Sequence, residues 1–341
     1  MVPRLGVFIL PPLLGALLVL GCGDKPAAHG SAGGLVVIAD EADRSAIQPL
    51  LTGSFSRVIY TPQPESLFRI SWTSADSLKL HIRSPLLLLA ATLDGGGGAS
   101  RLLRSMTTPE IEVGIRSGDL ALFSRRDPWA RGQWLLILAA PDGATLAWRA
   151  RRWEDSLHTW AVTATLQRLK EPLRREGLST KEKRLSEEYH FTLEMENGFK
   201  LVEANDSSGY IRWHLPKPSR WLTVAWGALP EPKRRTAQFL YERCKAMREA
   251  FSEPVVIYDD RWEWEEADIN GLPAIKIRGL WAGLEPVGGG PFFCYGLWNL
   301  SDQRYYIIDG AVFAPGEAKM PYLWQLEAQA QTFIPPDSQE K

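Results

Sequence analysis

The hydrophobic positions in the first half of the chain form short continuous runs that alternate with amphipathic segments. An apolar run over Leu35 to Ala39 precedes an amphipathic segment that starts near Asp40 or Glu41. A second run, "PLLLLAATL", precedes a glycine run, and a third covers Trp134 to Ala139. Short apolar runs bounded by turn residues are typical of buried strands, and spacings of three and four residues are typical of helices. The pattern predicts a mixed α/β part over residues 35–143.

A long helix is predicted next. Apolar residues recur at steps of three and four from Ala144 to Ala164, and the opposite face is highly charged. The helical signal continues towards residue 187, with a break expected at Pro172 or Gly177. Residues 144–187 are therefore interpreted as a long amphipathic helix that connects two halves.

The second half, residues 188–334, has more strand-like patterning. Three strands are expected over 198–229, followed by a helix with Pro232 in its first turn, strands around the Asn270-Gly271 turn, and a last helix from about Lys319 to Phe333. Antiparallel strands covered by helices are the economical assembly. The predicted fold class is α+β, with two halves that each hold a mainly antiparallel or mixed sheet covered by helices, and residues 335–341 are expected to be a disordered tail.

The N-terminus reads as an export signal. The stretch "MVPRLGVFILPPLLGALLVLGC" has one basic residue, Arg4, then an apolar segment, then a small residue before Cys22. This order is typical of a secretory signal over residues 1–21, and its end resembles the bacterial lipobox, in which the Cys is acylated. The alternatives are an ordinary signal with an incidental Cys, or a short membrane anchor. The pattern favours lipidation at Cys22.

The segment after Cys22 indicates in which membrane of the cell envelope the protein is anchored. Residues 22–34 are small and polar and are predicted to be a lipidated flexible tether. Gly23 follows the Cys, which departs from the inner-membrane retention signal of enterobacterial lipoproteins. The prediction is a lipid-anchored protein of the bacterial cell envelope, on the periplasmic face of the outer membrane rather than on the inner membrane.

Composition and charge narrow the function classes. The formal net charge is −1 with both signs interspersed along the sequence, so nucleic acid is not expected as a partner. The histidines are scattered and no nucleophile motif is present, so no cofactor and no metal are expected. Cys244 falls on the apolar stripe of a predicted helix, which favours a buried free thiol, and a disulfide with Cys294 stays open.

Two glycine runs invite a ligand-binding interpretation. Gly95 to Gly98 lie between an apolar strand and a short helix, where backbone amides can bind phosphate. The Lys-Ser/Thr of a P-loop is absent, so a flexible loop is predicted. Gly288 to Gly290 lie between two predicted strands, and we expect them to supply positive φ and close backbone approach in the connection.

One acidic stretch, "DDRWEWEEAD", combines carboxylates with aromatic rings. Glycosidases need two carboxylates across a sugar, and aromatic rings bind sugars well. The candidate ligand-contact residues are Trp262, Glu263, Trp264 and Glu265. In a strand, the two carboxylates share one face and the two rings share the other, which is equally what a strand with one wet and one packed face requires.

Several stretches together resemble a known family: "TPQPESLF", "PWARGQ", "NGFKLVE", "IRGLWAGLEPVGGGPF" and "FAPGEAKMPYLWQLEA". They are similar to stretches of a lipoprotein family of unknown function from Bacteroidetes-type bacteria, catalogued as domain of unknown function 4837. The resemblance implies an envelope lipoprotein with no assigned activity or catalytic residues. The order of strands and helices in the C-terminal half also resembles the PsbP and Mog1-like sandwich.

These observations give two functional hypotheses. The first is a non-catalytic envelope lipoprotein that binds or assembles another envelope component, with membrane lipid as a partner through acylated Cys22 and another envelope protein or a glycan as a further partner. The alternative is an envelope hydrolase acting on glycan or peptide, with the segment Asp259 to Glu266 as its candidate site.

Overall fold

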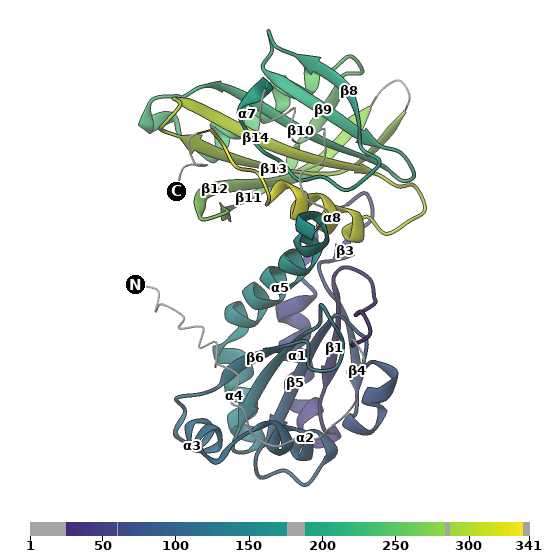
Figure 1. The fold of residues 1–341 in the computed structure, drawn as a ribbon, viewed down its shortest axis with the longest axis vertical. Coiled ribbons are helices and arrows are strands. Elements are labelled where there is room, and N and C mark those ends of the chain that lie inside the picture. Colours follow the sequence, from purple (N-terminus) through teal and green to yellow (C-terminus); the bar gives the residue numbers. More distant parts are fainter. Residues whose placement is uncertain (1–24, 60, 176–187, 284–286, 337–341) are drawn as a thin grey trace. The chain divides into compact units, whose positions relative to one another are not determined.

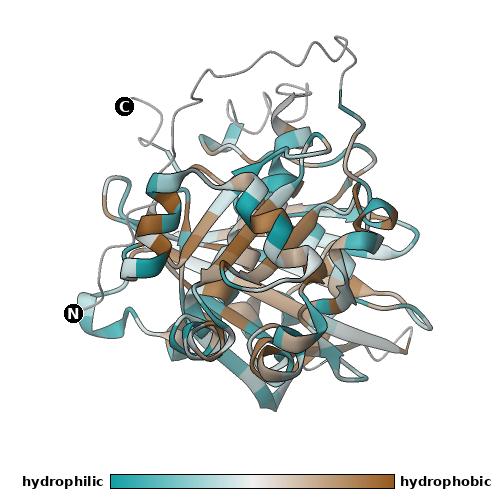
Figure 2. Cartoon of the chain, turned by 90° about the horizontal axis from the view of Figure 1, so that it is seen from below, coloured by the Kyte–Doolittle hydropathy of each residue, from teal (hydrophilic) through white to brown (hydrophobic). Residues whose placement is uncertain are grey.

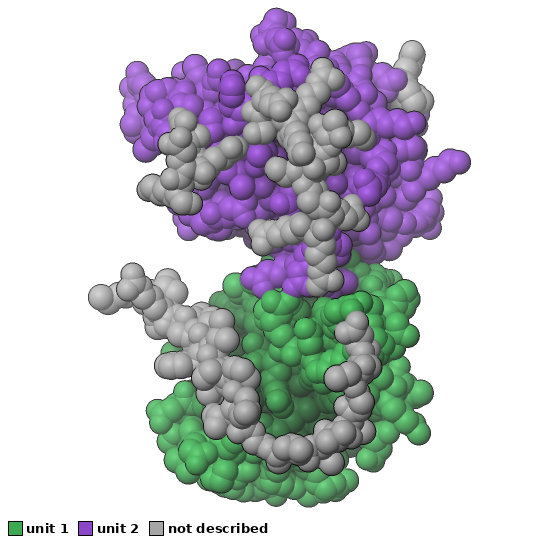
Figure 3. Space-filling view, viewed as in Figure 1, with its two compact units in different colours: residues 1–57, 68–164 green, residues 58–67, 165–341 purple. Residues whose placement is uncertain are grey.

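The computed structural model describes residues 25–59, 61–175, 188–283 and 287–336. The chain divides into two compact units (Figure 3): unit 1 comprises residues 1–57 and 68–164, and unit 2 comprises 58–67 and 165–341. Each unit contains a sheet covered by helices, which confirms the predicted α+β class (Figure 1). The predicted signal peptide, Cys22 and residues 337–341 of the predicted tail lie outside the described residues.

Unit 1 is built on a five-stranded sheet in the order β4-β1-β5-β7-β6. β1, β4, β5 and β7 run parallel, and β6 pairs antiparallel with β7. All seven residues of β5 are buried, as expected for a central strand with both faces covered. The strands are β1 (Gly34–Ile38), β4 (Arg69–Thr73), β5 (Leu86–Thr92), β6 (Leu122–Arg126) and β7 (Trp134–Ala140).

The helices of unit 1 follow the strands in the crossover pattern that parallel strands require. α1 packs against α4, while η1, α2 and α3 share a core with alternate residues of β5 and β7. The strands are largely brown in Figure 2, between helices that carry teal outer residues. The helices are α1 (Glu41–Phe55), η1 (Ala75–Leu80), α2 (Gly98–Met106), α3 (Pro109–Ser117), α4 (Gly143–Arg152) and α5 (Glu154–Arg175), the last of which continues into unit 2.

The single connecting helix expected over residues 144–187 is wrong in one respect, because two helices occupy this region. α4 ends at Arg152, Trp153 caps it, and α5 begins at Glu154 and continues through Pro172. Basic residues fill the last turn of α4 and acidic residues fill the first turn of α5. Each set suits the helix dipole at its position, so a helix end and a helix start are both stabilised there. Residues 176–187 lie outside the described residues.

The predicted flexible tether over residues 22–34 is also wrong for its described part. The amides of Ala28 and His29 donate to the carbonyls of Arg131 and Arg83, at 2.8 and 2.7 Å, and the amide of Arg131 donates to Pro26 at 2.9 Å. These backbone bonds hold the segment from Lys25 onward along unit 1. Small polar composition is compatible with flexibility, but it also lets a chain lie close to a neighbouring backbone.

Unit 2 is built on a seven-stranded antiparallel sheet in the order β11-β12-β13-β14-β10-β9-β8. α7 (Ala237–Glu249) and α8 (Met320–Ala330) contact different residues of it, as described below. The strands are β8 (Lys200–Asn205), β9 (Tyr210–Leu215), β10 (Ser219–Ala228), β11 (Val255–Ile269), β12 (Leu272–Gly283), β13 (Gly288–Asn299) and β14 (Arg304–Phe313), and a short helix η2 covers Pro232–Arg234.

The glycine triad at 288–290 opens β13 rather than forming the connection. Its three residues pair with Gly283, Ala282 and Trp281 of β12. None of the three has positive φ, so that part of the prediction is wrong. The close approach is confirmed, because a Cβ on Gly290 would lie 2.0 Å from the carbonyl oxygen of Val312. The glycines allow the backbones of neighbouring strands to come together.

A ten-residue segment from the N-terminal half belongs to unit 2. It contains the two-stranded ladder β2 (Val58–Ile59) and β3 (Glu65–Ser66). The Glu65 carboxylate accepts the amides of Lys319 and Met320 at 2.8 to 3.0 Å and thereby caps α8. Two of the stretches that carry the family resemblance therefore meet in one structural contact, which sequence periodicity did not indicate.

Candidate functional site

One face of the unit 2 sheet carries a row of polar side chains beneath α7. Strand register places Cys294, Asp309, Thr223 and Arg212 side by side on β13, β14, β10 and β9. The next row on the same face contains Phe292, Ala311, Trp221 and His214. Side chains at alternate positions share a face, so these two rows form one continuous surface.

α7 contributes a buried ion pair to this surface. The Arg248 guanidinium contacts the Asp309 carboxylate, and the exposed fractions of the two side chains are 2% and 1%. Cys244, one turn earlier on α7, donates its Sγ hydrogen to Asp309 at 3.8 Å. Both described cysteines are free and buried, as the apolar stripe predicts for Cys244. Burial raises the pKa of the Cys294 thiol well above its ordinary value.

Arg212 lies at the centre of an aromatic cage. Its guanidinium carbon is 4.1 Å from the ring centroid of Phe251 and 5.5 Å from that of Trp221. The Trp221 ring stacks on His214 at 4.9 Å and meets Trp281 edge to face at 5.7 Å. Glu203 is the nearest carboxylate in an ion pair with Arg212, at 4.0 Å, and it already accepts from Tyr210 and Ser252.

Five buried polar atoms on this face have no hydrogen-bond partner. Three are obligate donors, the Nε hydrogens of Arg212 and Arg248 and the Nε1 hydrogen of Trp281; the other two are Thr223 Oγ1 and His214 Nε2. Arg212, Arg248, Trp281 and Thr223 are each more than nine-tenths buried. Buried polar groups are nearly always hydrogen-bonded in folded proteins, so a cluster of unpartnered donors calls for an acceptor.

The Arg212 guanidinium is only partly compensated by the carboxylates around it. Burial and then the nearby Arg248 lower the pKa of the Arg212 guanidinium, while Asp309, Glu203 and Glu253 oppose the change incompletely. Burial and then Arg212 also lower the pKa of His214, so its imidazole is neutral at pH 7. A carboxylate beside Arg212 would both accept the free hydrogens and restore favourable surroundings for the guanidinium.

The opposite face of the same sheet buries charges that are paired. Lys276 Nζ lies 2.6 Å from a Glu327 oxygen of α8, with side chains 4% and 3% exposed. Arg278 approaches Glu327 at 3.8 Å and Glu265 at 2.8 Å. Burial and then Arg278 lower the pKa of Lys276 to about 8, against the raising effect of Glu327.

The predicted ligand-contact residues lie on β11, with the rings and the carboxylates on opposite faces as the alternation requires. Trp262 stacks on Tyr241 of α7 at 4.4 Å, and Trp264 is 55% exposed. Glu263 is exposed, and Glu265 forms an ion pair with Arg278. The structure brings the two carboxylates to one face of the strand, where Glu265 balances a cation of the sheet. Whether this stretch binds a glycan stays a prediction.

The glycine run at 95–98 does not leave an open helix end. The Asp40 carboxylate, which follows β1, accepts the amides of Ala99 and Ser100 at 2.8 and 3.1 Å. A Cβ on Gly97 would lie 2.1 Å from the Asp40 side chain, so glycine is what admits this carboxylate. The position that a phosphate would take at the start of α2 is therefore filled by the protein itself.

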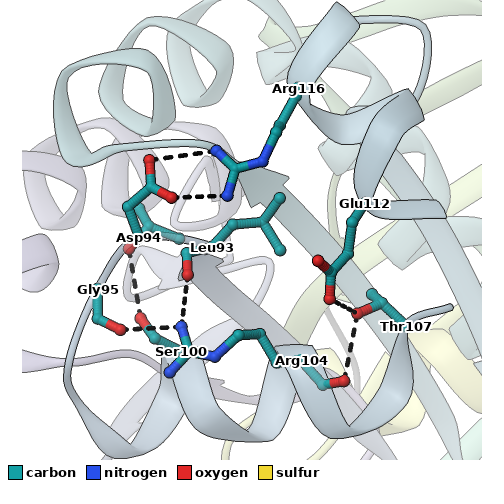
Figure 4. A network of polar contacts seen from close by, with 9 residues as sticks. Leu93, Asp94, Gly95, Ser100, Arg104, Thr107, Glu112 and Arg116 are labelled. Carbon is teal, nitrogen blue, oxygen red and sulfur yellow. Dashed lines mark hydrogen bonds and ion pairs between the residues drawn. The ribbon is translucent and has the colours of Figure 1, made fainter. Parts of the chain in front are cut away.

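Side chains of α2 and α3 brace the same loop (Figure 4). Arg104 donates to the carbonyls of Leu93 and Gly95, and Arg116 makes two bonds to Asp94, at 2.7 and 3.3 Å. The loop after β5 is thus held by side chains, which differs from the flexible loop predicted from composition.

In the part of the chain that the structure describes, no group of three or more His, Cys, Asp or Glu side chains could hold a metal ion. Within the same residues, no helix is both long and apolar enough to cross a membrane.

Sequence reasoning missed the residues of the α7 face. Arg212 and His214 alternate with apolar residues in "YIRWHL", and Thr223 alternates with them in "RWLTVAW". Polar residues at alternate positions usually indicate a solvent-facing side. Only the packing of α7 over this face reveals that these polar groups are buried, although an Arg flanked by Tyr, Ile and Trp was a usable signal.

Part of the chain is similar to a known family and to solved structures. No curated protein matches the chain. Among solved structures, the Ran-binding protein Mog1p of Saccharomyces cerevisiae is similar at 12% identity and a TM-score of 0.31, covering 43% of this chain and 91% of that one. A Mog1 E65A mutant is similar at 12% identity and a TM-score of 0.30, with 43% and 92% covered. Residues 178–332 match the family model described as a domain of unknown function, DUF4837.

Proposed function

We propose that this protein is a lipid-anchored component of the bacterial cell envelope whose unit 2 is a non-catalytic binding module for a small molecule that bears a carboxylate. The observation that carries the proposal is the cluster of unpartnered, buried donors on the α7 face. The anchor rests on a separate feature, the sequence around Cys22.

The chemistry of the cluster selects the ligand class. The obligate donors come from two guanidinium groups and an indole, and a carboxylate offers several lone pairs to such donors. The rings of Trp221, Phe251 and Trp281 supply apolar surroundings, in which a charge-assisted hydrogen bond is stronger than in water. An organic carboxylate with an apolar body fits both properties.

Binding is favoured over catalysis because the cluster has no activated nucleophile. The Cys244 thiol donates to Asp309, and the Cys294 thiol is kept protonated by burial. A thiolate is the reactive form of cysteine, so a thiol with a raised pKa is inert. His214 stacks on Trp221 and is held as a neutral ring.

The binding claim is tested by calorimetric titration of the mature chain with benzoate and with benzamide. Benzoate should bind, and benzamide, which has the same shape without the charge, should bind at least tenfold more weakly. Arg212→Met should abolish benzoate binding. Arg220→Met is the matched control. Arg220 is equally buried on β10 and its Nε also has no hydrogen-bond partner, but it contacts Gln325 and Glu196 on the other side of the strand.

Two outcomes would contradict the binding claim: no heat with benzoate at millimolar concentration, or equal losses in the two arginine variants. The anchor has its own test, in which Cys22→Ala should release the protein from membranes into the soluble fraction. Retention of that variant on membranes would refute anchoring through acylated Cys22 and leave the binding claim untouched.

A further inference from the structure

Basic residues gather at the edge of the unit 1 sheet at which the parallel strands begin. The turns before β5 and β7 carry Arg83 and Arg131, and β4 begins with Arg69. β6 runs antiparallel and brings Arg125 and Arg126 to the same edge, opposite the start of β7. These five arginines and Lys25 are all exposed. We call this set, Lys25, Arg69, Arg83, Arg125, Arg126 and Arg131, the basic edge.

Among the described residues, the turn between β6 and β7 beside the basic edge carries a half-buried carboxylate, Asp127, which is engaged within its own turn. Its Oδ1 accepts the amides of Gly132 and Gln133 at 2.6 and 3.1 Å. At the opposite edge, where the parallel strands end, Asp40, Asp94 and Asp142 follow β1, β5 and β7, and Arg116 pairs with Asp94.

Exposed apolar side chains accompany the basic edge. Leu80, at the end of η1, is 77% exposed, and Ile82 is 37% exposed. The Gln133 side chain donates to the carbonyls of Ile82 and Ser84 at 2.9 and 2.7 Å, which holds this turn beside the start of β7. Basic side chains with neighbouring exposed apolar ones are typical of surfaces that lie in a membrane interface.

The chain that leads to Cys22 ends on the basic edge. Lys25 Nζ donates to the carbonyl of Asp127 at 2.7 Å, and Arg83 Nε donates to that of Ala27 at 3.1 Å. Three residues span at most about 11 Å, so the Cα atom of an acylated Cys22 would lie within that distance of the Cα atom of Lys25. Because the segment from Lys25 onward is hydrogen-bonded to unit 1, an acylated Cys22 would keep this edge of unit 1 close to the bilayer surface.

We propose that the basic edge of unit 1 lies on the surface of an anionic bilayer, with Leu80 and Ile82 entering the headgroup layer. This rests on the proposed anchoring at Cys22 for its orientation, and on charge complementarity for its partner. Each basic residue close to an anionic surface contributes about fivefold to binding, and salt screens that contribution.

The test uses the mature chain with Cys22→Ser, so that no acyl chain contributes. Sedimentation with vesicles of phosphatidylcholine and phosphatidylglycerol should show binding that vesicles of phosphatidylcholine alone do not support, and 0.5 M NaCl, a concentration at which the Debye length falls to about 4 Å, should weaken it. Arg125→Glu should lower the partition coefficient at least fivefold. Leu80→Asp should lower it as well. Arg234→Glu on η2 makes the same charge change elsewhere and should lower it less than twofold.

The inference is overturned if the two lipid mixtures bind equally, or if Arg125→Glu and Arg234→Glu have the same effect. Circular dichroism of each variant separates loss of binding from loss of folding. Because the acyl group is absent, these results do not depend on whether Cys22→Ala releases the protein from cells. Failure of the anchor and failure of the basic edge are thus distinguishable.

Discussion

The two faces of the unit 2 sheet bury charges in different ways. Under α8, Lys276 and Arg278 share the Glu327 carboxylate, and Arg220, whose Nε has no hydrogen-bond partner, still forms an ion pair with Glu196. Under α7, Arg248 has Asp309, but Arg212 is poorly compensated and five polar atoms have no partner. Buried charges that are paired can contribute to the stability of the fold. Buried donors without partners lower that stability, and a bound acceptor would remove the penalty. This difference is the basis for proposing a structural role for the α8 face and a binding role for the α7 face.

The largest expected loss of stability comes from removing the buried anion under α8. Glu327→Gln removes the anion between two buried cations and should lower the free energy of unfolding by about 3–5 kcal/mol. The control is Glu265→Gln, because the Glu265 side chain is 52% exposed and its ion pair with Arg278 is screened by water. That change should cost less than about 1 kcal/mol in urea denaturation. Equal losses would remove the distinction between a buried network and a surface pair.

The pH dependence of the free energy of unfolding tests the same face with Glu327 in place. The pKa of Lys276 is lowered to about 8 in the folded protein, below its value of 10.5 in the unfolded chain. Between these values the unfolded state binds more protons, so this group makes the protein more stable as pH rises from 8 to 10.5. The slope is at most about 1.4 kcal/mol per pH unit. Lys276→Met should lack this slope, and an identical pH profile in the variant would contradict the assignment.

A third prediction concerns the contact that holds the start of α8. Glu65→Ala leaves the amides of Lys319 and Met320 without an acceptor and should lower the free energy of unfolding by about 1–2 kcal/mol. Glu41→Ala, at an exposed position in the first turn of α1, should change it by less than about 0.5 kcal/mol. If the two variants unfold alike, the segment from residue 58 to 67 does not anchor α8.

The smallest expected change in stability comes from a substitution on the α7 face. Arg212→Met replaces an undercompensated buried cation with an apolar chain of similar length, and we expect the free energy of unfolding to change by less than about 1 kcal/mol. Glu203 keeps its bonds to Tyr210 and Ser252. A loss as large as that of Glu327→Gln would mean that Arg212 serves the fold and not a ligand.

Much of the fold follows from local patterning. The buried runs at 35–39 and 134–139, the stripe of α7 and the Asn270-Gly271 turn all reflect burial or turn geometry that neighbouring residues decide. The capping of α8 by Glu65 joins positions 254 and 255 residues apart, and no local period records such a contact. The same holds for Asp40 at the start of α2, which fills the place that the glycine run alone suggested for a phosphate.

The candidate site was less accessible to sequence reasoning than the fold. The stretch "DDRWEWEEAD" was predicted to be a site because its carboxylates and rings are close in sequence. In the structure, Glu265 forms an ion pair with Arg278 of β12. The five unpartnered atoms are spread over three strands and a helix, and only strand register and the packing of α7 bring them to one face. Strand pairing is set by long-range packing, which alternation alone does not specify.

The most direct measurement is a crystal structure of the mature chain grown with 4-bromobenzoate, with anomalous scattering used to locate the bromine. The account predicts a bromine peak among Trp221, Phe251 and Trp281, with the carboxylate accepting from Arg212. A map in which the five unpartnered atoms contact ordered water, with no bromine on the α7 face, would contradict it.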